Sequence, residues 1–363
     1  MAYTFSKYMK LKSAIAAVAF AAITALSGCN SVIYDDEGDC DIHHRLLFRF
    51  ERNLLFADAF SSQVQSVAVY AFNPDGTFAW QRSEYGAQLA SDGYYMNLDG
   101  VAPGTYTLVG WCGMENQWIA TRPESFTLPD LIPGQTRMEE LICRMEREYR
   151  EDMTAHSSAD LWPLFHGFTA DVTILPSDGP EANGQTITYT MNLMKNTNKV
   201  RVILQQLSGE DINVDGFTFS IESANGLMAH HNGLLDDDKI TYHPWRTSSG
   251  YAGLVLDPMG NATGAIHPAK VAIADLTVAR LMVDDPMILT VRRPDGELSA
   301  RIPLIDYALY TKGNYDRPME DQEFLDREDT YTLTFFLDKQ YKWGETTIYI
   351  NAWRVVLHNE DVN

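Results

Sequence analysis

Basic residues are scarce in this 363-residue sequence, which has 28 lysines and arginines against 49 aspartates and glutamates. The formal net charge is −21, so the chain lacks the positive surface that binding to nucleic acid requires. The same charge argues against attraction to an anionic headgroup layer. Any attachment to a membrane must therefore come from something other than surface charge.

The chain also has few cysteines and lacks the short motifs of common active sites. Its four cysteines, Cys29, Cys40, Cys112 and Cys143, form no Cys-x-x-Cys pair, which argues against a zinc site or thioredoxin-like chemistry. No Gly-x-Ser-x-Gly, Gly-x-Gly-x-x-Gly or phosphate-binding loop occurs. We therefore predict a protein that is not an enzyme and that has no catalytic residue, no metal site and no cofactor.

The run Asp236-Asp237-Asp238 suggests a calcium site. An EF-hand loop needs spaced oxygen ligands and a glycine at its sixth position, which here, counting from Asp236, is Thr241. We interpret the run as an exposed acidic turn, with a calcium ion near Asp236 as the open alternative.

Long hydrophobic runs are missing except near the start of the chain, where Ala14 to Leu26 is interrupted only by Thr24. Three lysines, Lys7, Lys10 and Lys12, precede this run. As a helix it would reach only about 20 Å at roughly 1.5 Å per residue, too short for a bilayer core of about 30 Å. The pattern therefore predicts a secretory signal peptide and not a transmembrane anchor.

The end of this run, Leu26-Ser27-Gly28-Cys29, resembles the bacterial lipobox. The resemblance implies that a signal peptide of residues 1–28 is removed and that Cys29 carries lipid. Two or more acyl chains, at about 0.8 kcal/mol per buried methylene, hold a protein stably on a membrane. Met9, which is followed by Lys10, is an alternative start to Met1.

Residues 29–41 form an acidic tether. Self-repulsion predicts an extended, solvated linker. Acidic residues directly after a lipidated cysteine also resemble the surface-export signal of Bacteroidetes lipoproteins, and both interpretations stay open. The acidic residues are Asp35, Asp36, Glu37, Asp39 and Asp41.

Behind the tether, short alternating segments predict β-strands. Leu46, Phe48 and Phe50 alternate with more polar residues, as in a half-buried strand. Pro74-Asp75-Gly76 and Pro294-Asp295-Gly296 predict hairpin turns. Many short strands and almost no helical periodicity predict an all-β protein built from β-sandwiches.

A polar stretch, Glu146 to Ala159, lacks strand patterns and is the best candidate for a domain boundary. We predict an N-terminal β-sandwich at 42–150 and a C-terminal one at 160–363, with one short helix from Pro318 to Arg327. Lipid on Cys29 leaves three thiols and at most one disulfide bond. Of the possible pairs we favour Cys40 with Cys143, although sequence cannot show whether their Cα atoms lie within about 7 Å.

Several stretches in a fixed order resemble the anchoring-subunit family of Bacteroidales fimbriae. Besides the lipobox they are Asp39-Cys40, Tyr70-Ala71-Phe72, Pro103 to Trp111, Asn225-Gly226, Tyr242-His243-Pro244, Ala279-Arg280-Leu281, Phe324 to Glu328 and Ile348 to Trp353. The last stretch departs from the family at Ala352, where glycine is usual.

The resemblance implies two tandem transthyretin-like β-sandwich domains in a lipoprotein of the outer membrane, and exposure at the cell surface is part of the same expectation. It implies a subunit at the base of a fimbrium that attaches the polymer and limits its length. Its partners would be fimbrial shaft subunits, some of which are thought to lose an early strand by proteolysis. This chain is expected to keep its early strand and so to end the polymer.

The C-terminal stretch is the expected contact with the shaft, through Ile348, Ile350 and Trp353, because an exposed sheet edge can accept another chain's strand. The alternative function is a surface lipoprotein that binds glycans through an exposed row of aromatic side chains. A row of this kind among the seven tryptophans would favour the alternative.

Overall fold

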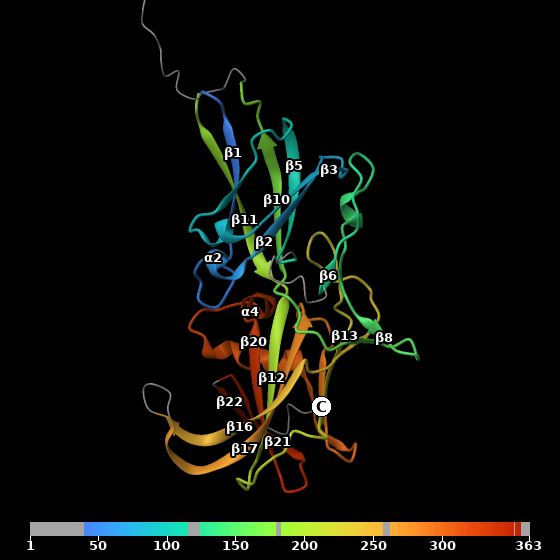
Figure 1. Ribbon diagram of the computed structural model, residues 1–363, viewed down its shortest axis with the longest axis vertical. Helices are drawn as coiled ribbons and strands as arrows, with labels where there is room; N and C mark the ends of the chain where they lie inside the picture. The colour runs from blue at the N-terminus through green and yellow to red at the C-terminus, as the bar shows by residue number, and fades with distance from the viewer. Residues whose placement is uncertain (1–39, 115–123, 179–182, 257–261, 352, 357–363) are drawn as a thin grey trace, which may run out of the picture. The chain divides into compact units, whose positions relative to one another are not determined.

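The computed structural model describes residues 40–114, 124–178, 183–256, 262–351 and 353–356. Its elements are mostly strands, which confirms the predicted all-β class (Figure 1). The strands are β1 His43–Arg49, β2 Ser66–Phe72, β3 Phe78–Tyr85, β4 Tyr95–Asn97, β5 Gly104–Cys112, β6 Phe126–Thr127, β7 Cys143–Met145, β8 Glu148–Tyr149, β9 Ala155–Ser157, β10 Phe165–Ile174, β11 Thr186–Lys195, β12 Thr197–Gln206, β13 Thr218–Ser223, β14 Leu227–Met228, β15 Ile240–Tyr242, β16 Arg246–Leu256, β17 Ala262–Ala279, β18 Ile288–Arg292, β19 Leu298–Pro303, β20 Thr330–Leu337, β21 Trp343–Ile350 and β22 Trp353–Val356. The helices are α2 Phe60–Gln63, α3 Leu304–Leu309 and α4 Asp321–Arg327, with 3₁₀ turns at η1 Ala87–Ala90, η2 Met138–Glu140 and η3 Lys312–Asn314.

The first sheet has the strand order β3-β2-β5-β10-β11-β1-β4. Its strand β11 pairs in parallel with β1 over residues 186–192 and antiparallel with β10 over residues 193–195. Leu46 and Phe48 of β1 are buried in one core with Val67 and Val69 of β2, as period-two alternation predicts. The early strand therefore lies inside the sheet, between β11 and β4.

Two further sheets of six strands each share a second, larger core. Their strand orders are β16-β17-β12-β20-β21-β22 and β19-β18-β13-β15-β9-β8. Val202 of β12 and Leu333 of β20 are buried in the same cluster as Ile221 of β13 and Leu289 of β18. The alternating strands of the two sheets thus bury one face each, which is the arrangement of a β-sandwich. A small third sheet has the order β14-β7-β6.

The sheets do not divide at the predicted boundary between 150 and 160. Strands β10 and β11, which follow that boundary, belong to the first sheet, whereas β8 and β9 join the sheet of β13. Val109 and Trp111 of β5 also belong to the larger core. The polar stretch is therefore not the point where one sheet ends, and it contains two short strands itself.

The chain divides into two compact units. The larger unit contains residues 43–176 and 186–363, and the smaller one contains residues 1–42 and 177–185. In the described part of the small unit, the N–H of Gly184 donates to the carbonyl of Cys40 at 2.9 Å. The N–H of Ile42 donates to the carbonyl of Ser177 at 3.0 Å.

Both predicted Pro-Asp-Gly turns are present. Gly76 and Gly296 have φ of 82° and 85°, values that favour glycine, and each donates its N–H back across the turn. The predicted helix begins later than expected, at Asp321, because Glu320 is still extended. Pro318 is therefore not its first residue. Helix α3 has no counterpart among the predictions.

Candidate functional site

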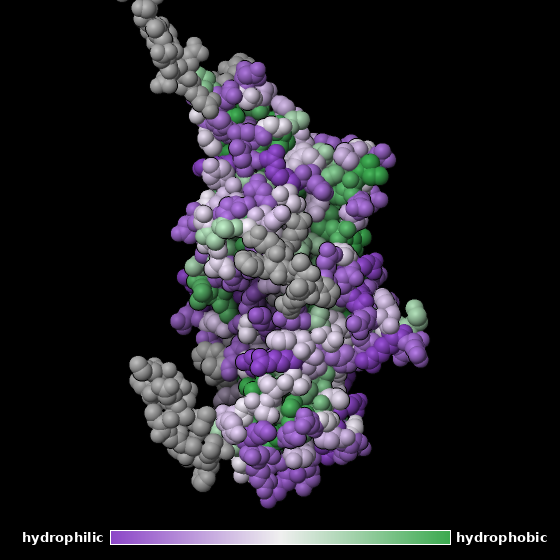
Figure 2. All heavy atoms as spheres, in the orientation of Figure 1, coloured by the Kyte–Doolittle hydropathy of each residue, from purple (hydrophilic) through white to green (hydrophobic). Residues whose placement is uncertain are grey.

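The predicted lipidation site, Cys29, and most of the tether lie outside the described residues. In the described residues no helix is both long and apolar enough to cross a membrane. Hydrophilic residues cover most of the face shown in Figure 2, and hydrophobic ones gather in small separate patches.

The predicted disulfide bond between Cys40 and Cys143 finds no support. Cys143 is a free thiol and is fully buried on β7, whereas Cys40 is exposed. Burial raises the pKa of the Cys143 thiol and that of Cys112, the latter to about 12. Both buried thiols are therefore protonated at neutral pH and act as small apolar side chains.

The predicted contact residues near the C-terminus form a hairpin and not one continuous strand. Asn351, with φ of 54°, stands in the turn between β21 and β22. Ile348 and Ile350 are fully buried, as cross-strand neighbours of Phe335 and Leu333. A partner contact through these two side chains therefore conflicts with their place in the core. Trp353 begins β22, and its side chain is not among those described.

Residues of four separate family motifs meet in one buried polar network. The hydroxyl of Tyr242 donates to Asn225 Oδ1 at 2.6 Å, and Asn225 Nδ2 donates to the carbonyl of Arg280 at 2.9 Å. Asn225 and Tyr242 are fully buried. Burial raises the pKa of Tyr242, so the hydroxyl keeps its proton and remains a donor. The motifs thus lie far apart in the sequence and close together in the fold.

Asp326 of α4 is the counter-ion in this network. Its side chain is only 3% exposed, and its Oδ1 accepts from Arg280 Nη2 at 3.0 Å and from Gln322 Nε2 at 2.9 Å. Its Oδ2 lies 3.0 Å from Arg52 Nη2, on the segment that follows β1. Arg280 Nη1 donates to the carbonyl of Asn232. One carboxylate therefore joins α4 to the ends of β17 and β1.

The last two motifs are also connected. Asn351 Oδ1 accepts from the N–H of Thr332 at 2.8 Å, and Asn351 Nδ2 donates to Glu328 Oε2 at 3.4 Å. The hydroxyl of Tyr315 donates to the same carboxylate at 3.0 Å. Burial raises the pKa of Glu328, and burial beside Glu328 raises that of Tyr315 to about 12. These contacts fix the C-terminal hairpin to the end of α4.

The acidic run at Asp236 is occupied by protein partners. The side chain of Asp237 is only 5% exposed and accepts from Arg147 Nη1 at 2.8 and 2.9 Å, and Asp238 accepts from the hydroxyl of Tyr149 at 3.2 Å. A Cβ added to Gly226 would lie 2.5 Å from Arg147 Nη2, so this glycine leaves room for the ion pair. With Asp237 paired to Arg147, the carboxylates of Asp236 and Asp238 alone are too few for the six to eight oxygens that calcium takes.

The histidines form no metal-binding group among the residues that the structure describes. His44 is buried and its Nε2 accepts from the N–H of Leu175 at 3.1 Å. His166 is also buried and its Nε2 contacts the carbonyl of His230 at 2.8 Å. His156 Nδ1 lies 2.9 Å from His243 Nε2, with the two rings stacked. These side chains serve the packing of the strands that carry them.

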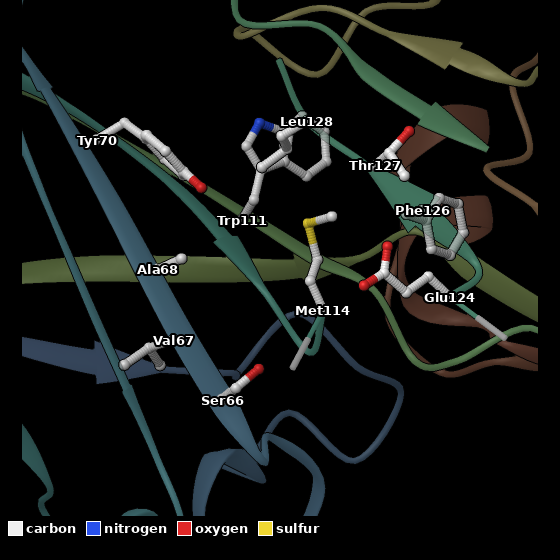
Figure 3. Close-up of a pocket in the computed structure, with 10 residues that line it drawn as sticks. All are labelled: Ser66, Val67, Ala68, Tyr70, Trp111, Met114, Glu124, Phe126, Thr127 and Leu128. Atoms are coloured by element: carbon white, nitrogen blue, oxygen red, sulfur yellow. The ribbon is translucent and has the colours of Figure 1, made fainter. Parts of the chain in front are cut away.

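The described tryptophans form no exposed row of the kind that binds glycans. Trp111 and Trp343 are buried, and Trp245, at 37%, is the most exposed of those whose side chains are described. A cavity of about 190 Å³ lies between β2, β5 and residues 124–128. Figure 3 shows the Met114 side chain in its middle, between Trp111 and Phe126. This cavity is smaller than typical ligand pockets, which measure about 300–1,000 Å³. A second hollow, of about 480 Å³, is lined by Trp80 and Tyr106 in edge-to-face contact.

The fold is that of an all-β protein in which two sheets form a sandwich and the motif residues are largely buried. The sequence matches the family described as "Fimbrillin-A associated anchor proteins Mfa1 and Mfa2" over residues 36–359. The chain belongs to this family of fimbrial anchor proteins, which confirms the resemblance to the anchoring subunits. Membership implies a place at the cell surface, on a fimbrium.

Three relatives illustrate the similarity. The Minor fimbrium anchoring subunit Mfa2 of Porphyromonas gingivalis is 23% identical over 248 residues, which cover 66% of this chain and 69% of that protein. The crystal structure of a proposed adhesin from Bacteroides thetaiotaomicron is 31% identical, with a TM-score of 0.71 over 89% of this chain and all of that one. A proposed polysaccharide-binding protein of the same organism is 26% identical, with a TM-score of 0.70 over 88% and 99% of the two chains.

Proposed function

We propose that this chain is the lipid-anchored subunit at the base of a fimbrium, attached to the outer membrane through Cys29. The observation that carries the proposal is the family match, which runs through nearly the whole chain behind a lipobox cysteine. Fimbrial shaft subunits are the partners, and the membrane is reached through lipid because the acidic protein cannot use charge.

The position of β1 supports a role in ending the polymer. This strand is hydrogen-bonded on both sides, to β4 and to β11, and the side chains of Leu46 and Phe48 are buried in the core. Arg49 and Arg52, where a protease specific for arginine would cut, have partly exposed side chains, at 43% and 41%. A protease, however, needs an accessible, extended backbone. Pairing with β11 denies this on β1 through Arg49, and the ion pair with Asp326 holds Arg52 in place. The strand therefore stays in place, connected to the lipid, and leaves no groove for a further subunit.

Replacing Cys29 with alanine tests the proposal, with Cys40→Ala as the matched control at the next cysteine. We expect Cys29→Ala to lose acylation and leave the membrane fraction, and the cells to release their fimbriae, while Cys40→Ala behaves like the natural chain. Deleting the gene should also give longer fimbriae in electron micrographs. Retention of Cys29→Ala in the membrane fraction would refute lipid anchoring.

Glycan binding is the second candidate, because one relative is described as a proposed polysaccharide-binding protein. The described tryptophans do not support it, since Trp111, Trp162 and Trp343 are buried. The hollow beside Trp80 and Tyr106 is the place where a sugar ring would stack. Measurable binding of a polysaccharide that is lost in Trp80→Ala would favour this candidate over the anchor.

A further inference from the structure

Strand β16 forms one end of the sheet β16-β17-β12-β20-β21-β22. It pairs with β17 in a regular antiparallel ladder from Arg246 opposite Asp275 to Ala252 opposite Ala269, and the register shifts beyond Ala252. No other strand of the described residues pairs with its outer side. Figure 1 shows β16 and β17 leaving the sheet together as one curved ribbon.

Strand β17 has partners on both sides along only part of its length. Its pairing with β12 ends where Ala272 lies opposite Leu204, whereas its pairing with β16 continues through Val271 and Lys270. An isolated two-stranded ribbon is only marginally stable in water. A further strand on the outer side of β16 would therefore add hydrogen bonds where the pairing within this chain ends.

The regular part of this strand is unprotected. We call residues Thr247 to Ala252 the β16 edge; their sequence, Thr-Ser-Ser-Gly-Tyr-Ala, has no charge and no proline. The side chains of Thr247, Ser249 and Tyr251 are exposed, that of Tyr251 by 64%. Natural proteins usually block exposed sheet edges with charged residues, proline, bulges or very short strands.

The other ends of the large described sheets carry such protection. Strand β19 contains Arg301 and Pro303, and β3 contains Arg82 and Glu84. Strands β4 and β8 have only three and two residues, and β22 carries Arg354 among its described residues. Strand β16 itself begins with Arg246 and has register shifts beyond Ala252, so the β16 edge is the part of it that has neither a charge nor a bulge. Its six consecutive neutral residues form a longer uncharged run than β3 or β19 offers.

We propose that the β16 edge accepts an extended strand from the adjoining fimbrial subunit. The proposal rests on the proposed function, because an anchor must hold one shaft subunit, and it moves the contact from β22 to the opposite end of the same sheet. Main-chain N–H and C=O groups supply the affinity in such strand addition. The neutral edge fits a segment without charged side chains, since a charge there would have no opposite charge to meet.

Lysines on the exposed face of the strand test the proposal. The double variant Ser249→Lys/Tyr251→Lys places two charges on the β16 edge, and Gln81→Lys/Ser83→Lys adds the same charge to exposed positions of β3. The readout is fimbrial protein in the culture medium against that on the cells, with membrane levels and protease resistance of each variant measured alongside. We expect at least roughly a tenfold rise in released fimbriae for the β16 variant and none for the β3 control.

A cross-linking experiment covers the case in which lysines disturb folding. A photoreactive benzoylphenylalanine replaces Ser249 or, as control, Ser83, in chains that are otherwise natural and stay on the cell. A cross-link from position 249 alone to a fimbrial subunit supports the proposal. A cross-link to a second copy of this chain, or none, overturns it.

The deletion strain separates the two proposals. If deletion releases fimbriae and the folded β16 variant retains them, strand addition at β16 is wrong while the anchor function stands. If the deletion strain keeps its fimbriae attached, the anchor function fails and the docking proposal fails with it.

Discussion

Removing the carboxylate of Asp326 is the sharpest test of the buried motif network. Asp326→Ala leaves the Arg280 guanidinium, whose side chain is 9% exposed, without its counter-ion. Arg52 is 41% exposed and can turn to water, so most of the cost falls on Arg280. Arg280 Nη1 still has the carbonyl of Asn232, but a carbonyl does not neutralise the charge.

The expected loss is about 3–5 kcal/mol of unfolding free energy, the usual cost of leaving one partner of a buried ion pair uncompensated. Asp321→Ala, five residues earlier on α4, is the matched control. Its partner Lys312 and Asp321 itself are 31% and 49% exposed, and pairs of this kind contribute about 0–1 kcal/mol. The two variants lose the same formal charge from the same helix.

The unfolding free energy of both variants is measured by urea unfolding of the chain without residues 1–29. Far-ultraviolet circular dichroism and tryptophan fluorescence follow the transition. Coincident transitions by the two probes are needed before a single free energy is assigned. Arg280→Met with Asp326→Leu should recover part of the loss, because apolar pairs of similar size often replace buried ion pairs. An Asp326→Ala variant no less stable than Asp321→Ala would refute the role assigned to this carboxylate.

Two further outcomes follow from the same core. Gly226→Ala should lower the unfolding free energy by about 1–3 kcal/mol, because the added Cβ would lie 2.5 Å from both Arg147 Nη2 and Ile240 Cδ1; an unchanged urea midpoint would contradict this. Burial, helped by the charge of Arg280, lowers the pKa of His166 to about 4, so between pH 6.5 and 4 the unfolded chain binds a proton that the folded chain does not. Stability should therefore fall as pH drops through this window, by up to about 3 kcal/mol, and His166→Gln should flatten that slope in urea titrations at stepped pH.

The local pattern of the sequence was enough to predict the strand class and several elements. Alternation placed Leu46, Phe48 and Phe50 in the core, and both Pro-Asp-Gly turns connect antiparallel strands. These features depend on residues within a few positions of one another. They required no knowledge of the rest of the fold.

Sheet membership could not be predicted in the same way. Strand β11 joins β1 in parallel although more than 130 residues separate them, and nothing in either strand encodes that register. The C-terminal hairpin was missed because Asn351 adopts φ of 54° in a segment rich in strand-forming residues. The expected partner contact through Ile348 and Ile350 conflicts with their burial for a related reason. Alternation shows which side chains share a face of a strand, but not whether the core or a partner covers that face.

The motifs that identified the family describe its core more than its partner. Asn225, Tyr242, Arg280 and Asp326 are constrained in kind because each must satisfy a buried donor, acceptor or charge, and a change leaves an unpaired group. Strand addition constrains a sequence far less, since it uses main-chain groups and requires only that charge and proline be absent. A motif search therefore finds the network and passes over the β16 edge. The docking site of such an anchor has to be found from strand order and from the exposure of sheet edges.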